Sequence, residues 1–226
     1  MGSEPPLDQI ALPPEIETLR LEPAAPLVVV DVDEVLAMFM RGFEHFLNGH
    51  GLEVRLNYFA LFQNIFRPGA SEHLDVAAGR QLFEMFFETD VEDIDPAPGA
   101  REALAALARH ASIVILTNAP PQSRAPRARW LVKHGFDYPF VINTGPKGPA
   151  VAAIAAMTHG KAAFVDDLLP NLDSVAKEAP DVAAFQMVAD ERLRPLAFEA
   201  PDRHPRLDDW KDLGPAIAGA IGIARS

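Results

Sequence analysis

The chain has 226 residues, a formal net charge of −12 and no cysteine. Its length suffices for one substantial hydrophobic core, or for a core that carries a small inserted domain. The acidic balance argues against nucleic acid as a partner, because nucleic-acid backbones bind basic surfaces. The lack of cysteine excludes disulfides, thiolate metal sites and a cysteine nucleophile. No apolar run approaches the roughly 20 residues of a membrane span, and the N-terminus lacks a signal-peptide pattern, so we expect a cytoplasmic protein with no membrane partner.

Residues 1–25 are rich in proline and acidic residues and predict an extended N-terminal arm. Residues 27–31 then form a continuous apolar run that ends in an acid. Such a run, without alternation, is typical of a strand buried on both faces of a parallel sheet. Similar runs recur at 112–117, 139–143, 162–167 and 182–188.

Helical patterns separate most of these runs. They cover residues 99–110, 123–134, 148–159 and 170–178, and a last helix is expected over 208–222. Strands that alternate with helices predict an α/β fold, a three-layer Rossmann-like parallel sheet with helices on both faces. We assign residues 26–33 and 98–226 to this core domain.

The interval 34–97 breaks the alternation and has no strand-like run. It holds nine of the fourteen phenylalanines, in three groups at helical spacing: Phe39, Phe43 and Phe46; Phe59, Phe62 and Phe66; Phe83, Phe86 and Phe87. We predict a small helical cap domain over 34–97 with its own aromatic core. An aromatic ligand-binding box is the alternative, and both can hold, because an insert after the first strand lies over that strand's carboxyl end.

Polar side chains follow four of the five predicted strands. Ligands of open parallel sheets bind outside the carboxyl ends of the strands, so these side chains are expected to meet at one edge. One strand that ends in an acid is common, whereas four successive strands with polar ends are not. In chain order the residues are Asp31 and Asp33, Thr117 and Asn118, Lys147, and Asp166 and Asp167.

This ordered set resembles the four motifs of the haloacid dehalogenase-like superfamily, most of whose members are phosphatases. The resemblance covers about residues 26–190, and the long insert matches the helical cap of that family. It implies a five-stranded parallel sheet in which the strands, numbered along the chain, lie in the order 5-4-1-2-3. The segment 31–37 and the Asp166–Asp167 pair are most similar to the 5′-deoxyribonucleotidase branch.

The residue types suit phosphate chemistry. A carboxylate nucleophile such as Asp31 can form an acyl-phosphate and divide a difficult hydrolysis into two easier steps. Asp33 can protonate the leaving alkoxide and then activate water. Carboxylates beside a phosphate require a cation, and Mg²⁺ prefers oxygen ligands. The resemblance implies a magnesium site formed by Asp31, the backbone carbonyl of Asp33, and Asp166, with Asp167 in support.

Thr117 and Lys147 would hold the phosphoryl oxygens and neutralise charge that builds during transfer. Asn118 would add a donor to the substrate. Lys161 is the other lysine near the acidic pair, but it precedes the fourth strand. At about 3.3 Å per residue it lies roughly 16 Å from Asp166, at the wrong end of the sheet, so we assign the role to Lys147.

Two features bear on the substrate. Glu34 stands where many relatives have glycine, and its charge near the mouth of the site disfavours a highly anionic substrate. A basic stretch follows the second strand. It indicates either a solvated helix face or a binding site for a second anionic group of the substrate. It consists of Arg124, Arg127, Arg129 and Lys133.

The sequence therefore predicts a magnesium-dependent hydrolase of a small phosphomonoester, with a small phosphorylated metabolite as its partner. One alternative is a haloacid dehalogenase-type hydrolase, which needs the aspartate nucleophile but neither a second acid nor a metal. The other is a non-enzymatic binding protein on the same fold. A monomer and a homodimer are both compatible with the sequence, and the cap is expected to determine the substrate.

Overall fold

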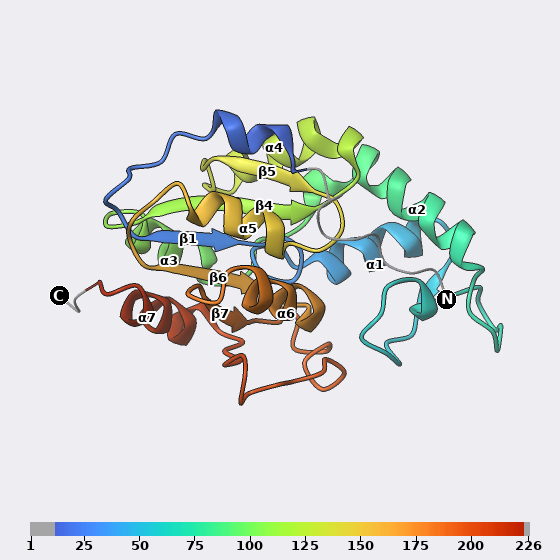
Figure 1. The fold of residues 1–226 in the computed structure, drawn as a ribbon. Coiled ribbons are helices and arrows are strands. Elements are labelled where there is room, and N and C mark those ends of the chain that lie inside the picture. Colours follow the sequence, from blue (N-terminus) through green and yellow to red (C-terminus); the bar gives the residue numbers. More distant parts are fainter. Residues whose placement is uncertain (1–11, 224–226) are drawn as a thin grey trace.

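A computed structural model describes residues 12–223 and contains a central sheet of five parallel strands (Figure 1). The strands are β1 (Leu27–Val30), β4 (Ser112–Asn118), β5 (Phe140–Asn143), β6 (Ala162–Asp166) and β7 (Ala183–Gln186). Their order across the sheet is β5-β4-β1-β6-β7. Numbered along the chain and read from the β7 edge, this is the fifth, fourth, first, second and third strand. The predicted α/β fold class is confirmed, and the strands lie in the expected order.

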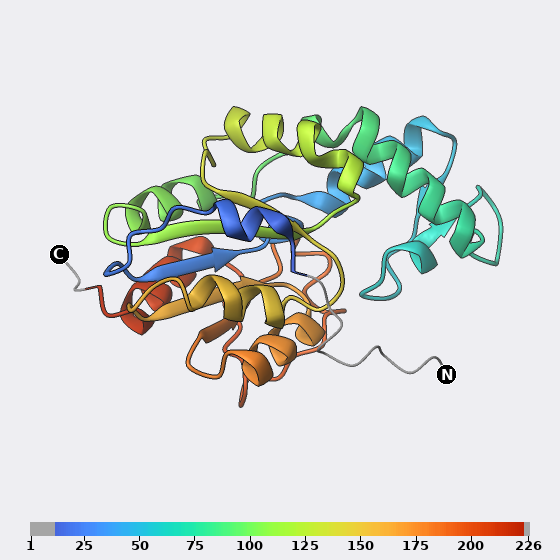
Figure 2. The same cartoon turned by 45° about the horizontal axis from the view of Figure 1, so that its top comes forward.

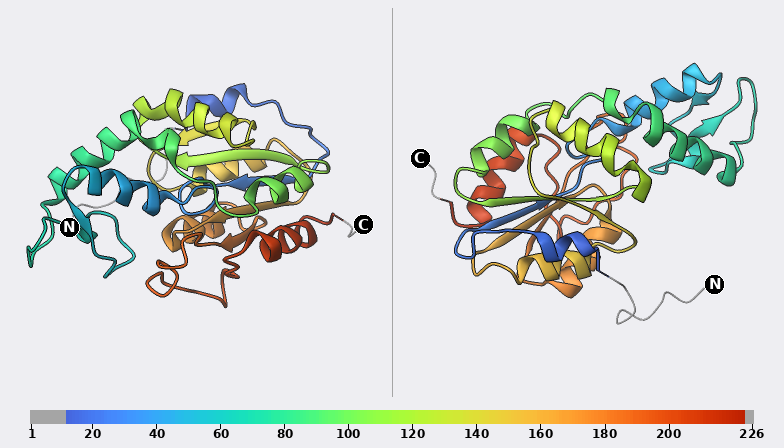
Figure 3. Two further views of the ribbon diagram at one scale, coloured as in Figure 1. Left: turned by 180° about the vertical axis from the view of Figure 1, so that it is seen from behind. Right: turned by 90° about the horizontal axis from the view of Figure 1, so that it is seen from above.

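Helices cover both faces of this sheet (Figure 3). Val28 and Val30 of β1 pack into the larger core cluster, with residues of α3 (Ala100–Leu107), α4 (Arg124–Lys133) and α7 (Trp210–Ala220). Leu27 and Val29 pack into the second cluster, with α5 (Gly148–Ala155), α6 (Leu169–Glu178) and the 3-10 helix η2 (Pro14–Thr18). Successive side chains of a strand point to opposite faces, and here both faces are apolar because both are covered.

Every helix expected in the core is present, within a few residues of its predicted bounds. The described part of the N-terminal arm, residues 12–25, contains η2 and is not fully extended. Ile16 and Leu19 are buried against the second core cluster, so these residues are part of the core packing. Residues 1–11 of the predicted arm lie outside the described residues. Within residues 12–223, no helix combines the length and the apolar character that a membrane crossing requires.

The insert between β1 and α3 lies beyond the carboxyl ends of the strands (Figure 2). Phenylalanine rings from its two α-helices form a shared aromatic core, with ring centroids 4.8–6.3 Å apart in pairs such as Phe83–Phe87 and Phe43–Phe83. The first and third phenylalanine groups of the sequence therefore behave as expected. The elements of the insert are α1 (Phe39–Gly49), β2 (Glu53–Val54), η3 (Phe62–Asn64), β3 (Ile65–Phe66), α2 (Val76–Thr89) and η4 (Val91–Asp93).

The middle phenylalanine group, Phe59 to Phe66, does not lie on an α-helix, so that expectation from spacing was wrong. Strand β3 pairs with β2 as a short antiparallel hairpin. The fully buried side chain of Asn64 explains the irregular backbone beside it. Its Oδ1 accepts from the N–H groups of Asn57 (3.0 Å) and Tyr58 (3.3 Å), and its Nδ2 donates to the carbonyls of Tyr58 (2.8 Å) and Ala60 (2.6 Å). Such bonds offer the backbone an alternative to a helix.

Candidate active site

The carboxyl ends of β1 and β6 bring three acids together. The two strands are neighbours in register, with Val30 opposite Val165, so the residues at their ends are adjacent. Oxygen atoms of Asp31, Asp166 and Asp167 all lie within 4.8 Å of one another, and all three side chains are buried. The sequence placed these residues at one edge, and the structure brings them together there.

Lys147 lies between two of these acids. Its Nζ is 2.7 Å from Asp31 Oδ1 and 2.7 Å from Asp166 Oδ2, and its side chain is almost completely buried. The next residue, Gly148, begins α5 against α6. A Cβ atom there would lie 2.3 Å from the backbone oxygen of Ser174, so only glycine permits this close approach. The packing of α5 on α6 thus fixes where Lys147 enters the site.

Asp166 is held by the start of α6. Its Oδ1 accepts from the backbone N–H of Leu168 (2.9 Å) and from Nδ2 of Asn171 (3.0 Å). Asn171 was not assigned a role from the sequence. It has no separate motif, and the only signal for it is its place in the first turn of the helix that follows the acidic pair.

Negative charge at this edge exceeds the charge of Lys147. Burial, with Asp166 and Asp33 adding to it, raises the pKa of Asp31 to about 7 although Lys147 opposes the shift. Burial and the neighbouring Asp166 also raise the pKa of Asp167 well above its usual range. Burial alone would lower the pKa of Lys147, but Asp166 and Asp31 raise it above its ordinary value. A hard divalent cation with oxygen ligands would stabilise these acids, so the residues fit a magnesium ion.

Asp33 is oriented differently from the three clustered acids. Both of its carboxylate oxygens accept from Nη2 of Arg127, at 2.7 and 3.0 Å, and Arg127 is completely buried. The Arg127 guanidinium also lies 5.0 Å from the ring centroid of Phe87 in the insert. Burial raises the pKa of Asp33, and Arg127 opposes this shift. Arg127 thus connects Asp33, the predicted acid–base residue, with Phe87 of the insert.

The rest of the basic stretch is paired with acids of the chain. Arg124 contacts Glu15, Arg129 Nη2 lies 2.6 Å from Glu92 Oε1, and Lys133 Nζ lies 3.5 Å from Asp93 Oδ1. These three side chains remain partly exposed, as a solvated helix face would be, whereas Arg127 does not. None of the four residues lines the cavity beside Asp31, which disfavours the reading as a site for a second anion.

The remaining predicted residues lie on β4. Thr117 is completely buried, and its hydroxyl has no hydrogen-bond partner among the described residues. Asn118 donates from Nδ2 to the carbonyl of Gly145 at 2.9 Å and accepts from Asn143 at 2.9 Å. Asn118 faces the cavity beside Asp31, but one of its donors is already used within the protein.

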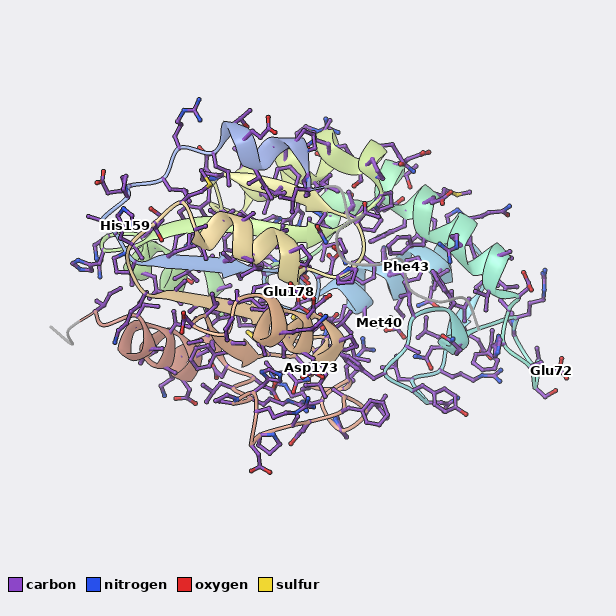
Figure 4. All side chains as sticks on the ribbon, viewed as in Figure 1. Met40, Phe43, Glu72, His159, Asp173 and Glu178 are labelled. Carbon is purple, nitrogen blue, oxygen red and sulfur yellow. The ribbon has the colours of Figure 1, made fainter. Side chains whose placement is uncertain are left out.

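A cavity of about 290 Å³ lies at the carboxyl ends of the strands; Asn118 lines it and Thr117 does not. Asp31, Asp33, Lys147 and Asp167 line its core side and, together with Asp166, are called the acidic floor. The insert lines the opposite side with six side chains, called the apolar roof, and Met40 lies where the insert meets the sheet (Figure 4). The roof consists of Phe39, Met40, Phe59, Ala60, Leu61 and Phe83. A larger cavity of about 830 Å³ lies between α3 and α7, and none of the predicted site residues lines it.

Glu34 borders the same cavity and has a left-handed backbone, with φ of 57°. This conformation suits glycine best, and in this chain a glutamate adopts it. The carboxylate of Glu34 accepts from the N–H of Met40 (2.7 Å) and of Asp190 (3.0 Å). Burial raises its pKa to about 7. Glu34 therefore ties the start of α1 to the loop after β7.

No protein-family model matches this sequence, and no curated protein is significantly similar to it. Solved structures do match. The magnesium-bound YfnB protein of Bacillus subtilis aligns with a TM-score of 0.59 at 11% identity, over 86% of this chain and 99% of that one. A predicted phosphoglycolate phosphatase of Haemophilus somnus aligns with a TM-score of 0.57 at 16% identity, over 84% and 96%.

A haloacid dehalogenase-like hydrolase of Streptococcus pneumoniae has a TM-score of 0.56 at 11% identity, over 85% of this chain and 98% of that one. Each match includes more than four-fifths of this chain and almost all of the other chain. At such low identity the matches establish only the fold. The chemistry depends on the residues of this chain. The chain has the haloacid dehalogenase-like fold.

Proposed function

We propose that this chain is a magnesium-dependent hydrolase of a small phosphomonoester, and that Asp31 is its nucleophile. The observation that carries the proposal is the buried cluster of Asp31, Asp166 and Asp167 around Lys147, open to a cavity on one side. Buried carboxylates with raised pKa values are costly to maintain, and such groups concentrate at functional sites. Asp31 is the member of the cluster that lines the cavity at the end of the central strand.

The proposed reaction has two steps. The carboxylate of Asp31 attacks phosphorus, and the oxygen of the alcohol leaves with a proton from Asp33. Water then gives up a proton to Asp33 and attacks the phosphorus of the aspartyl-phosphate, which releases phosphate and regenerates Asp31. Asp33 lines the same cavity, and its ion pair with Arg127 favours the carboxylate, the form required for the second step.

Lys147 and Thr117 would hold the phosphoryl oxygens, with Asn118 as a further donor. A bound magnesium ion, held by Asp31, Asp166 and the carbonyl of Asp33 with Asp167 in support, would neutralise phosphate charge that the acids alone would repel. Residues 34–97 would act as a cap that opens for the substrate and excludes water when closed.

The test is phosphate release from a panel of phosphomonoesters, with magnesium and with EDTA. We expect release that requires magnesium and is lost in Asp31→Asn. An absence of turnover across a broad panel, with no magnesium binding in a calorimetric titration, would favour the binding-protein alternative. Halide release from 2-haloacids in the presence of EDTA would favour the dehalogenase alternative.

A further inference from the structure

The chemistry of the cavity changes sharply from the floor to the roof. The roof is entirely apolar, and four of its six side chains are only half-buried: Phe59, Ala60, Leu61 and Phe83. On the core side, Leu168 is 42% exposed at the same cavity. Apolar side chains that remain open together around one cavity provide a surface for an apolar ligand group.

Phe59 packs against the larger core cluster but differs from its neighbours in how its ring is partnered. Phe39 and Phe83 each pair with other phenylalanine rings, and their own centroids are 6.0 Å apart. Among the ring pairs of the described residues, Phe59 takes part in none, although its side chain lines the cavity. A phenylalanine ring that lines the cavity without a ring partner is available to pair with an aromatic ring of a ligand.

The loop that carries Phe59 and Leu61 is fixed in place. Asn64 makes its four hydrogen bonds to the backbone of residues 57, 58 and 60, which surround Phe59 directly. The preorganised backbone lowers the entropy cost of binding a ligand at these side chains. The apolar surface is therefore built into the structure and is not a consequence of a loose loop.

Electrostatics restrict what else the ligand can carry. Lys147 is the only cation among the described residues that line the cavity, and it already contacts Asp31 and Asp166. Four acids line the same cavity: Asp31, Asp33, Glu34 and Asp167. A second anionic group of a substrate would find no free cation among these residues and would lie close to the negative phosphate of the same substrate, which is unfavourable in a partly desolvated site.

From these observations we infer that the substrate is a monophosphate of an apolar, ring-bearing alcohol with no second charged group. This inference rests on the proposed function and specifies its substrate class. The phosphate would lie on the acidic floor, and the ring would lie under Phe59, Leu61 and Phe83. A polyol or sugar phosphate would instead leave its hydroxyl groups unpaired against the roof.

The experiment compares three substrates of similar intrinsic reactivity: benzyl phosphate, 4-carboxybenzyl phosphate and glycerol 1-phosphate. All three release a primary alcohol, so differences in kcat/KM report recognition. We expect kcat/KM for benzyl phosphate to exceed both others by at least about tenfold. Equal kcat/KM values for the three substrates would overturn the inference, as would a preference for 4-carboxybenzyl phosphate or for glycerol 1-phosphate. Either result would leave the proposed hydrolase intact.

Two variants locate the ring. In Phe59→Ala, kcat/KM for benzyl phosphate should fall about tenfold and that for glycerol 1-phosphate should stay the same. Tyr58→Ala is the matched control, because Tyr58 is the neighbouring residue, is 61% exposed and does not line the cavity. Equal losses in the two variants, or an equal loss on both substrates in Phe59→Ala, would contradict the assignment.

Calorimetric binding of benzylphosphonate, which cannot be hydrolysed, gives a readout independent of turnover. With magnesium present it should bind at least about tenfold more tightly than 4-carboxybenzylphosphonate, and Phe59→Ala should remove most of this difference. If this binding is found without hydrolysis of any phosphate ester, the proposed function fails and the apolar subsite stands. If neither phosphonate binds, the subsite is wrong.

Discussion

The acidic floor and the apolar roof are built by different means. Floor residues follow strands of a buried sheet, so their positions are set by strand pairing and by helix packing such as that of Gly148 on Ser174. Roof residues lie on two helices and a loop, and their positions depend on ring packing and on one asparagine. A rigid polar floor suits a fixed reaction, whereas an apolar roof on a separate insert is free to vary with the substrate.

The largest expected effect is the loss of the nucleophile from the floor. Asp31→Asn should lower kcat by at least about 1,000-fold, because the acyl-phosphate can no longer form. The variant should still unfold cooperatively, since the amide has nearly the same volume as the carboxylate. Asp181→Asn, at an exposed position before β7, is the control and should keep wild-type kcat. Substantial phosphate release by purified Asp31→Asn would show that Asp31 is not the nucleophile.

The buried cation of the floor should matter for stability as well as for activity. Lys147→Met leaves Asp31 and Asp166 without their shared partner, and we expect a loss of about 3–5 kcal/mol in the free energy of unfolding. Lys161→Met changes an exposed lysine at the opposite end of the sheet and should stay within about 0.5 kcal/mol of the wild type. Denaturant unfolding measures both, and similar values for the two variants would contradict the ion-pair geometry.

Glu34 borders the floor and accepts a hydrogen bond from Met40 of the roof. Its titration should change the free energy of unfolding with pH in a definite direction. Its pKa is raised from 4.5 to about 7 by burial. Between pH 4.5 and about pH 7 the folded chain keeps Glu34 protonated, whereas the unfolded chain has lost this proton. The contribution of Glu34 to the free energy of unfolding therefore falls as the pH rises through this range, and it stays low above about pH 7. Asp31 acts in the same direction, because its pKa is also raised to about 7.

Glu34→Gln removes the Glu34 part of this dependence. Relative to the variant, the wild type should lose up to about 3 kcal/mol of stability between about pH 5 and pH 8. Urea titrations of both proteins at several pH values measure the difference, and Glu72→Gln, at an exposed position in the insert, should show no such change. Parallel curves for wild type and Glu34→Gln would mean that Glu34 titrates normally.

The smallest effect is expected for the scaffold of the roof. Asn64→Ala removes the side chain that holds residues 57–61, so KM for benzyl phosphate should rise about three- to tenfold while kcat/KM for glycerol 1-phosphate changes little. Asn57→Ala removes an exposed side chain of the same loop and leaves its N–H in place. Steady-state kinetics should show no change in this control, and equal effects in both variants would argue against a specific role for Asn64.

The sequence was informative about the floor because few patterns are compatible with a buried parallel strand. A continuous apolar run that ends in Asp31 or Asp166 places its acid at the strand end, and neighbouring strands bring such acids together. The partner of Asp33 was not foreseeable in the same way. Arg127 belongs to a stretch of four basic residues, and only the packing of α4 against the insert shows which one is buried.

The sequence was less informative about the roof. Phe59, Phe62 and Phe66 have helical spacing, but the hydrogen bonds of Asn64 and the β2–β3 hairpin fix a different backbone there. Periodicity records only which residues are apolar, and a loop that presents apolar groups to a ligand has the same composition as a helix that buries them. Here the hydrogen bonds of Asn64 and the β2–β3 pairing favour the loop, and periodicity detects neither of them.

The most direct test of the account is covalent trapping. Wild-type protein is mixed with magnesium and benzyl phosphate labelled with ³²P, quenched in acid within one turnover, and digested for peptide mapping. The account predicts a hydroxylamine-sensitive label on the peptide that contains Asp31, with no label in Asp31→Asn or in EDTA. Phosphate release at the wild-type rate with no label on that peptide, or with a label on another residue, would contradict the central claim.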